Sequence, residues 1–233
     1  MGSVHTNKQF DVELQQLKDE LLQMGCLVRV QLDAVFNGLD CGLATLTSIV
    51  DREQVLDRLE TQIDSACNHV YLCRHPVAGD FRWLSAVCKI NGYLENIGDE
   101  SEKIAAQLTR IEILPADVFA RELHILAKKL LTLFDLAIHA FSRSNSQAAT
   151  ELITQLRFFD EYTANLPLRL LQNHNSDLNS MRFMLIVAAM ERISNQIKNM
   201  GKVMIYAENG TERRQPLPLT VQSPGPMTRP YAQ

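Results

Sequence analysis

The spacing of apolar residues constrains the fold of this chain more than any other feature, because apolar residues recur every three or four positions over long stretches. Side chains with this period line one face of a helix, which must be buried against other helices. The pattern therefore predicts an all-α protein of six helices with short breaks. The expected helical runs are about 10–39, about 43–74, from 80 to the break at Leu114-Pro115, from 117 to about 146, about 148–171 and about 178–207.

Proline, glycine and capping residues predict where several of these runs begin and end. The second run should end at His75-Pro76, since a residue before proline resists the helical conformation. Asp80 is a good N-cap for the third run, and Pro167 should kink or end the fifth. The last run should stop at Asn209-Gly210. Beyond it, the many prolines among Ser, Thr and Gln predict a disordered tail over 210–233.

Charge and composition exclude several kinds of protein. A net charge of −4 and a pI near 5.9 give no basic surface, so nucleic acid is not an expected partner. The longest apolar run, Phe183 to Met190, is far shorter than the ~18 residues that a membrane span needs. The five cysteines lack C-x-x-C spacing and mostly lie among apolar residues, which indicates buried, reduced thiols. We therefore expect a cytoplasmic protein that meets the membrane only through partners.

Two pairs of acidic residues stand out on the second and third runs. Glu95 and Asp99 are four residues apart, as are Glu60 and Asp64, so each pair shares a helix face. If the two helices pack antiparallel, four carboxylates come together. Such oxygen ligands suit iron and other hard or borderline cations, and less specifically zinc. The sequence therefore predicts a divalent or trivalent metal ion held by Glu60, Asp64, Glu95 and Asp99.

Two other interpretations of these acids remain open at this stage. The acids could form a solvated face paired with Arg58, Lys89 or Lys103, in a helical adaptor that binds no metal. A carboxylate di-metal oxidase would use Glu-x-x-His motifs, and none occurs in the chain. The chain also lacks a Gly-rich phosphate loop, G-x-S-x-G and H-E-x-x-H. We therefore expect a protein that is not an enzyme.

The order of helices and breaks occurs twice, which indicates an internal repeat. A shift of about 100 residues aligns Glu161 with Glu60 and Asn165 with Asp64. A shift of 96 residues aligns Glu191 with Glu95 and Asn195 with Asp99. The second half therefore keeps each Glu but has Asn in place of each Asp, and a neutral amide is a weaker ligand for cations. We predict two tandem three-helix bundles, over 8–112 and 113–209, with the stronger site in the first.

Two stretches of the first half carry a family resemblance. The run from His75 to Trp83, followed by Leu-Glu-Asn-Ile-Gly-Asp at 94–99, resembles the signature of the PhoU family. The resemblance covers about residues 8–208 and is strongest in the first half. It implies two tandem three-helix bundles and metal binding, to iron or zinc among others, at Glu60, Asp64, Glu95 and Asp99. Asn96 stands where the family usually has Arg, so a diverged paralogue is a second interpretation.

The same resemblance implies a function in regulation. PhoU proteins are cytoplasmic negative regulators of phosphate uptake that often dimerise. They link the ATPase of the phosphate ABC transporter to the histidine kinase that senses phosphate. We therefore expect this chain to act through protein contacts with these partners, and the resemblance also implies a homodimer.

Overall fold

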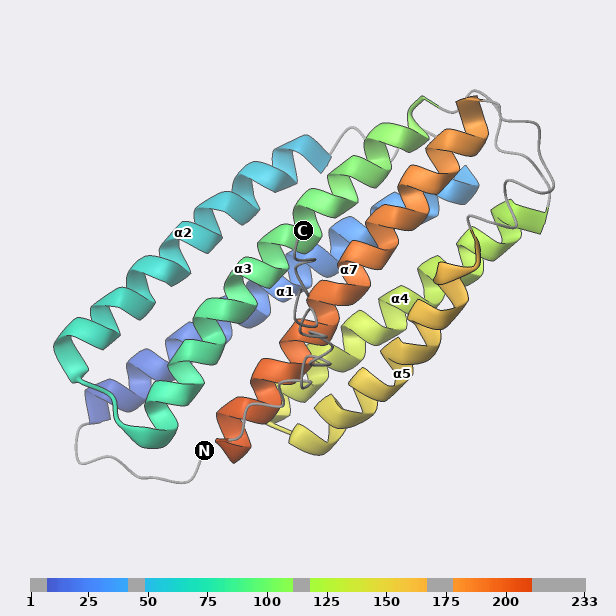
Figure 1. Cartoon of the computed structure of the whole chain (residues 1–233). Coiled ribbons are helices and arrows are strands. Elements are labelled where there is room, and N and C mark those ends of the chain that lie inside the picture. Colours follow the sequence, from blue (N-terminus) through green and yellow to red (C-terminus); the bar gives the residue numbers. More distant parts are fainter. Residues whose placement is uncertain (1–7, 42–48, 111–117, 167–177, 211–233) are drawn as a thin grey trace, which may run out of the picture.

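The computed structural model describes residues 8–41, 49–110, 118–166 and 178–210, and all of its regular structure is helical (Figure 1). The apolar stripes of the sequence face a continuous core. The helices are α1 (Lys8–Cys41), α2 (Ile49–Arg74), α3 (Ala78–Leu108), α4 (Val118–Arg143), α5 (Ser146–Ala164) and α7 (Leu178–Asn209). The prediction of an all-α protein with six helical runs is confirmed.

The helices form two groups of three that share one core. Helices α1, α2 and α3 pack on one another, and so do α4, α5 and α7. The most extensive contact between any two described helices joins α3 to α7, at the centre of the molecule (Figure 1). Leu94 of α3 and Met190 of α7 are fully buried in this shared core. The predicted boundary between the bundles, at 112/113, lies outside the described residues.

The corner between α2 and α3 differs from the sequence expectation in one respect. Helix α2 ends at Arg74, before Pro76, as predicted. However, α3 begins at Ala78 after Val77, which makes no side-chain cap. The amide of Asp80 donates to the carbonyl of Val77 (3.2 Å), so Asp80 already lies inside the first turn. The prediction of Asp80 as N-cap is therefore wrong, although its carboxylate still lies at the positive end of the helix dipole.

The ends of the second-bundle helices follow the capping rules. Asn145 caps α5 by accepting from the amide of Ala148 (3.0 Å). Gly210 follows α7 with a φ of 69°, and its amide donates to the carbonyl of Tyr206 (2.9 Å). A positive φ costs glycine little, so the predicted stop of the last helix is confirmed. Helix α5 ends at Ala164, several residues earlier than expected; Pro167 lies outside the described residues.

Further sequence expectations concern the tail, membrane spans and the thiols. Apart from Gly210, the predicted tail over 210–233 lies outside the described residues. No helix within the described ranges is long and apolar enough to cross a membrane. Of the described cysteines, Cys67 is buried and Cys88 is half-buried, whereas Cys26 and Cys73 are exposed. The expectation of buried thiols therefore fails for Cys26 and Cys73, which fall outside the apolar stripes of their helices.

Candidate functional site

The candidate site lies where α2 and α3 run side by side in opposite directions (Figure 1). The side-chain amide of Asn91 in α3 fixes their register. Its Nδ2 donates to Oδ1 of Asp64 (3.1 Å) and to the backbone carbonyl of Glu60 (2.9 Å), both in α2. Moving one turn along each helix from this contact brings Glu60 level with Glu95. The antiparallel arrangement that the acidic pairs required is therefore present.

The electrostatics of the two glutamates show that the four carboxylates influence one another. Burial raises the pKa of Glu95, and the charges of Asp99 and Glu60 raise it further. Burial likewise raises the pKa of Glu60, followed by the charges of Asp64 and Asp57. Glu60, Glu95 and Asp99 are half-buried, whereas Asp64 is exposed. Like charges on one partly desolvated face oppose ionisation, and a bound cation would relieve this repulsion.

The geometry of this acidic face is a strip and does not form a closed cage. Among the described side chains, no three from His, Cys, Asp and Glu lie close enough together to hold one metal ion. The donor set of two glutamates and two aspartates suits a hard cation in its chemistry. Holding one ion by three or more of them would need side-chain rotations across the α2–α3 groove. The residues therefore fit a metal in donor type but are not preassembled around one.

The three cations that could have paired with these acids have other partners. Lys103 Nζ contacts Oε1 of Glu100 (2.8 Å). Arg58 Nε donates to the carbonyl of Gln54 in its own helix (2.9 Å). Lys89 Nζ lies 6.0 Å from the ring centroid of Tyr206. None of these three contacts is an ion pair with the four acids, although the charge of Lys103 lowers the pKa of Glu95 and so offsets part of the rise caused by burial and like charges.

Asn91 is a residue of this face for which sequence analysis predicted no function. It is fully buried, and its Oδ1 is a buried atom without a hydrogen-bond partner among the described residues. Burying an unpartnered polar atom costs free energy. Its position four residues before Glu95, on the same helix face, was visible in the sequence, but its function as the link between α2 and α3 required the structure.

The equivalent face of the second bundle is built differently. Asp160 of α5 accepts from Ser194 Oγ of α7 (2.8 Å) and forms an ion pair with Lys198 of α7. The residues that the repeat aligned with the first site lie elsewhere: Glu161, Asn165 and Asn195 are exposed, and Glu191 is half-buried. Asn165 Nδ2 donates to the carbonyl of Glu161 in its own helix (3.1 Å). The second face therefore carries a lysine beside its acid.

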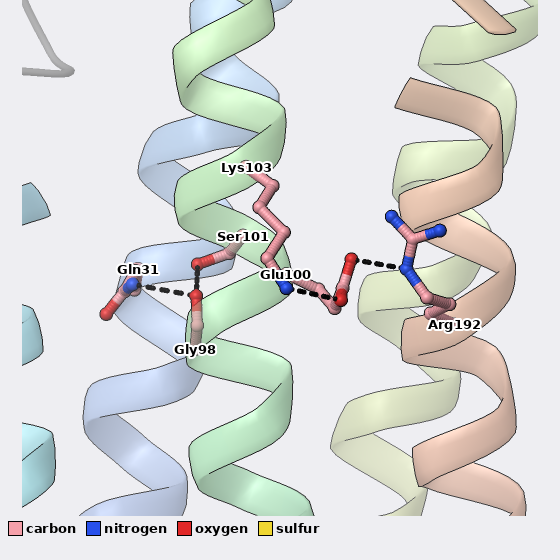
Figure 2. A network of polar contacts seen from close by, with 6 residues as sticks. All are labelled: Gln31, Gly98, Glu100, Ser101, Lys103 and Arg192. Carbon is pink, nitrogen blue, oxygen red and sulfur yellow. Dashed lines mark hydrogen bonds and ion pairs between the residues drawn. The ribbon is translucent and has the colours of Figure 1, made fainter. Parts of the chain in front are cut away.

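A second polar cluster joins the two bundles next to the acidic strip (Figure 2). Glu100 of α3 is buried and lies between Lys103 of α3 and Arg192 of α7, with its Oε2 2.7 Å from Nε of Arg192. On the opposite side of α3, Gln31 of α1 donates to the carbonyl of Gly98 (3.2 Å). Figure 2 shows that α3 thereby contacts α1 on one side and α7 on the other. The Leu94–Ile104 segment thus anchors three helices.

Comparisons with known proteins agree with this architecture. A family model described as the PhoU domain matches residues 21–108, which span most of the first bundle. Over 220 residues, the chain is 28% identical to a protein of Burkholderia sp named "Phosphate-specific transport system accessory protein PhoU homolog". This match covers 90% of this chain and 93% of the relative. The Escherichia coli (strain K12) protein, named "Phosphate-specific transport system accessory protein PhoU", is 24% identical over 92% of each chain.

Solved structures show the same fold. The crystal structure of PhoU from Pseudomonas aeruginosa superposes with a TM-score of 0.82 at 23% identity, covering 87% of this chain and all of the other. The crystal structure of the phosphate transport system regulatory protein PhoU from Streptococcus pneumoniae gives 0.81 at 20% identity, covering 88% of this chain. The fold is therefore that of an all-α protein of two packed helical bundles. Together with the domain match and the relatives, this shows that the chain is similar to PhoU proteins in fold and along most of its sequence.

Proposed function

We propose that this chain is a PhoU-type accessory protein that regulates phosphate transport in the cytoplasm. The observation that carries the proposal is the similarity to accessory proteins of phosphate-specific transport systems along nine-tenths of both chains. The chain would act as a negative regulator of phosphate uptake and of the phosphate-starvation response. Its expected partners are the ATPase of the phosphate ABC transporter and the phosphate-sensing histidine kinase, and it would act without catalysis. A homodimer belongs to the same proposal.

The test of this regulatory function is complementation. The chain is expressed in a bacterium that lacks its own PhoU protein and carries a phosphate-starvation reporter. We expect the reporter to be repressed in phosphate-rich medium, as it is with the native protein. Co-purification with the transporter ATPase from the same cells checks the physical contact. A folded, accumulating chain that neither represses the reporter nor retains the ATPase would contradict the proposal.

We further propose that the acidic strip of the first bundle binds a metal ion, with iron and zinc as the first candidates. Glu60 and Glu95 would hold the ion from facing helices, with Asp64 and Asp99 completing the set. The support is the partial burial of these carboxylates together with their mutual repulsion, which raise the pKa values of Glu60 and Glu95. When bound, the ion would supply positive charge that joins α2 to α3. The residues of the chain would supply oxygen ligands and the fixed α2–α3 register.

Elemental analysis by inductively coupled plasma mass spectrometry tests the metal proposal. We expect metal in the wild-type protein, purified without chelators and reconstituted with iron or zinc. Changing Glu95→Gln and Asp99→Asn together should abolish its binding while helicity stays near wild type. The matched control changes two exposed acids of the second bundle, Glu151→Gln and Glu161→Gln, and should keep the metal. Absence of metal from the reconstituted wild-type protein would favour the metal-free helical adaptor.

A further inference from the structure

Two cysteines meet across the interface between α2 and α3, a short distance along the helices from the acidic strip. The contact between Asn91 and Asp64 fixes the register at one point (3.1 Å). Three residues onward in α2 lies Cys67, and three residues back in α3 lies Cys88. Because the helices are antiparallel, these equal steps move in the same direction and keep the two residues opposite each other.

A second contact farther along shows that the helices stay side by side past the cysteines. The ring of Tyr71 in α2 packs on the ring of Phe81 in α3, with centroids 5.6 Å apart and an interplanar angle of 61°. Cys67 and Cys88 therefore lie between two contacts that hold the same pair of helices. The helix register therefore places the side chains of Cys67 and Cys88 opposite each other across the α2–α3 interface.

The two thiols differ in exposure and in acidity. Cys67 is fully buried, whereas Cys88 is half-buried. The hydrogen bond between them raises the pKa of Cys67 and lowers the pKa of Cys88, as expected when Cys67 donates to the sulfur of Cys88. A solvent-accessible thiol of lower pKa beside a shielded partner is the arrangement found where one cysteine reacts first and the other resolves. The accessible Cys26 and Cys73 have no such thiol beside them among the described residues; Cys73 faces His69 at 3.7 Å.

We propose that Cys67 and Cys88 form a redox modification site, in which a peroxide converts the pair into a disulfide that links α2 to α3. The thiolate of Cys88 attacks one peroxide oxygen, the O–O bond breaks, and the leaving oxygen departs as hydroxide or alkoxide. Cys88 is then a sulfenic acid. The sulfur of Cys67 attacks the sulfur of Cys88, loses its proton, and displaces the hydroxyl as water. The two thiols supply the two electrons that reduce the peroxide.

The consequence of this step is a covalent cross-link between α2 and α3 in the first bundle. While it is intact, the disulfide would fix the register of α2 against α3 near Asp64 and Asn91. It would also close a covalent loop that contains the turn at 75–77. Reduction by a dithiol would restore the two free thiols. This inference does not depend on phosphate regulation or on a bound metal, and its test has a readout separate from both.

The experiment uses the full chain with the other three cysteines, Cys26, Cys41 and Cys73, changed to Ser. The protein is treated with hydrogen peroxide, unfolded, and its remaining thiols are alkylated. We expect an intact mass lower by two hydrogens, no alkylation, and full reversal by dithiothreitol. Monomeric mobility on non-reducing gels should show that the bond is intramolecular. Two alkylated thiols after peroxide treatment, or a disulfide between chains, would overturn the proposal.

Two single variants in the same background assign the two cysteines. With Cys67→Ala, we expect oxidation to stop at Cys88, where dimedone traps the sulfenic acid. With Cys88→Ser, the modification of Cys67 should slow by at least ~10-fold, because its sulfur is buried. Circular dichroism confirms that both variants stay folded. Equal reaction of Cys67 with and without Cys88 would refute the assigned order.

Discussion

The two bundles of this chain differ in how the negative charge of their interhelical acids is balanced. In the first, the α2–α3 face carries four carboxylates, and burial together with their mutual repulsion raises the pKa of Glu60 and Glu95. In the second, the α5–α7 face carries Asp160, with Lys198 and Ser194 as its partners. A lysine on the helix opposite forms an ion pair with this acid, whereas the first face has only the longer-range charge of Lys103. The comparison teaches that the acid of the second face is paired within the chain, whereas the four acids of the first face are not paired with a cation.

The largest effect on stability should come from removing the lysine of the second face. Lys198→Met leaves the partly buried Asp160 without its counter-charge, and we expect unfolding to become easier by about 1–2 kcal/mol. The double variant Asp160→Asn with Lys198→Met removes both charges and should recover most of this loss. Urea denaturation followed by circular dichroism measures both.

The control for this prediction is Lys202→Met. Lys202 is exposed on the same helix, and its Nζ donates to Oδ1 of Asn199 (3.2 Å). Its loss should change the free energy of unfolding by less than about 0.5 kcal/mol. If Lys198→Met proved equally mild, Asp160 would not need a fixed cation, and the contrast between the two faces would disappear.

A smaller effect should appear at Glu95 of the first face. Because burial and like charges raise its folded-state pKa, Glu95 binds its proton more tightly in the folded protein. Its favourable contribution is full below the unfolded-state pKa and is lost as pH rises through the folded-state pKa. In chelator-containing buffer, Glu95→Gln should therefore stabilise the protein at neutral pH by less than about 1 kcal/mol, since solvent screens this half-buried group.

Urea denaturation across the range from mildly acidic to neutral pH tests this sign. The advantage of Glu95→Gln should shrink as the pH falls. Glu13 provides the opposite case, because a hydrogen bond from Arg74 lowers its pKa (2.8 Å between Nε and Oε2). Its contribution is present above the unfolded-state pKa and is lost as pH falls through the folded-state pKa. Glu13→Gln should thus destabilise the neutral protein, and a shared sign for both variants would contradict the prediction.

The sequence predicted the helices and the first acidic face well because both depend on local spacing. The period of the apolar residues, together with Pro76 and Gly210, predicted most helix ends. The four-residue spacing of Glu60 and Asp64 placed both residues on one helix face. The second face could not be predicted in the same way. One residue corresponds to about 100° of helix rotation, so an alignment that chose Glu161 missed its neighbour Asp160, which faces α7.

Long-range packing explains the other omissions. Glu100 is buried only because α7 packs against α3 and brings Arg192 to it (2.7 Å), a contact between residues 92 positions apart (Figure 2). The buried link made by Asn91 likewise depends on the rotation of α2 against α3. The rotation of one helix against another cannot be predicted from the spacing of residues within a single helix. Sequence periodicity therefore indicates which face is inside, but not which polar residues meet there.

The smallest effect is expected from restoring acids to the second bundle. Asn165→Asp together with Asn195→Asp recreates the spacing of the first-bundle motif in the sequence. Both positions are exposed, and the carboxylate that faces α7 is already paired with Lys198. We therefore expect no additional metal by elemental analysis after iron or zinc reconstitution, and a change in unfolding free energy within about 0.5 kcal/mol. If this variant gained metal, and still did so when Glu95→Gln and Asp99→Asn were also present, the second face would be shown to bind a cation too. The difference between the bundles would then rest on the two asparagines, and the lysine opposite Asp160 would not be its cause.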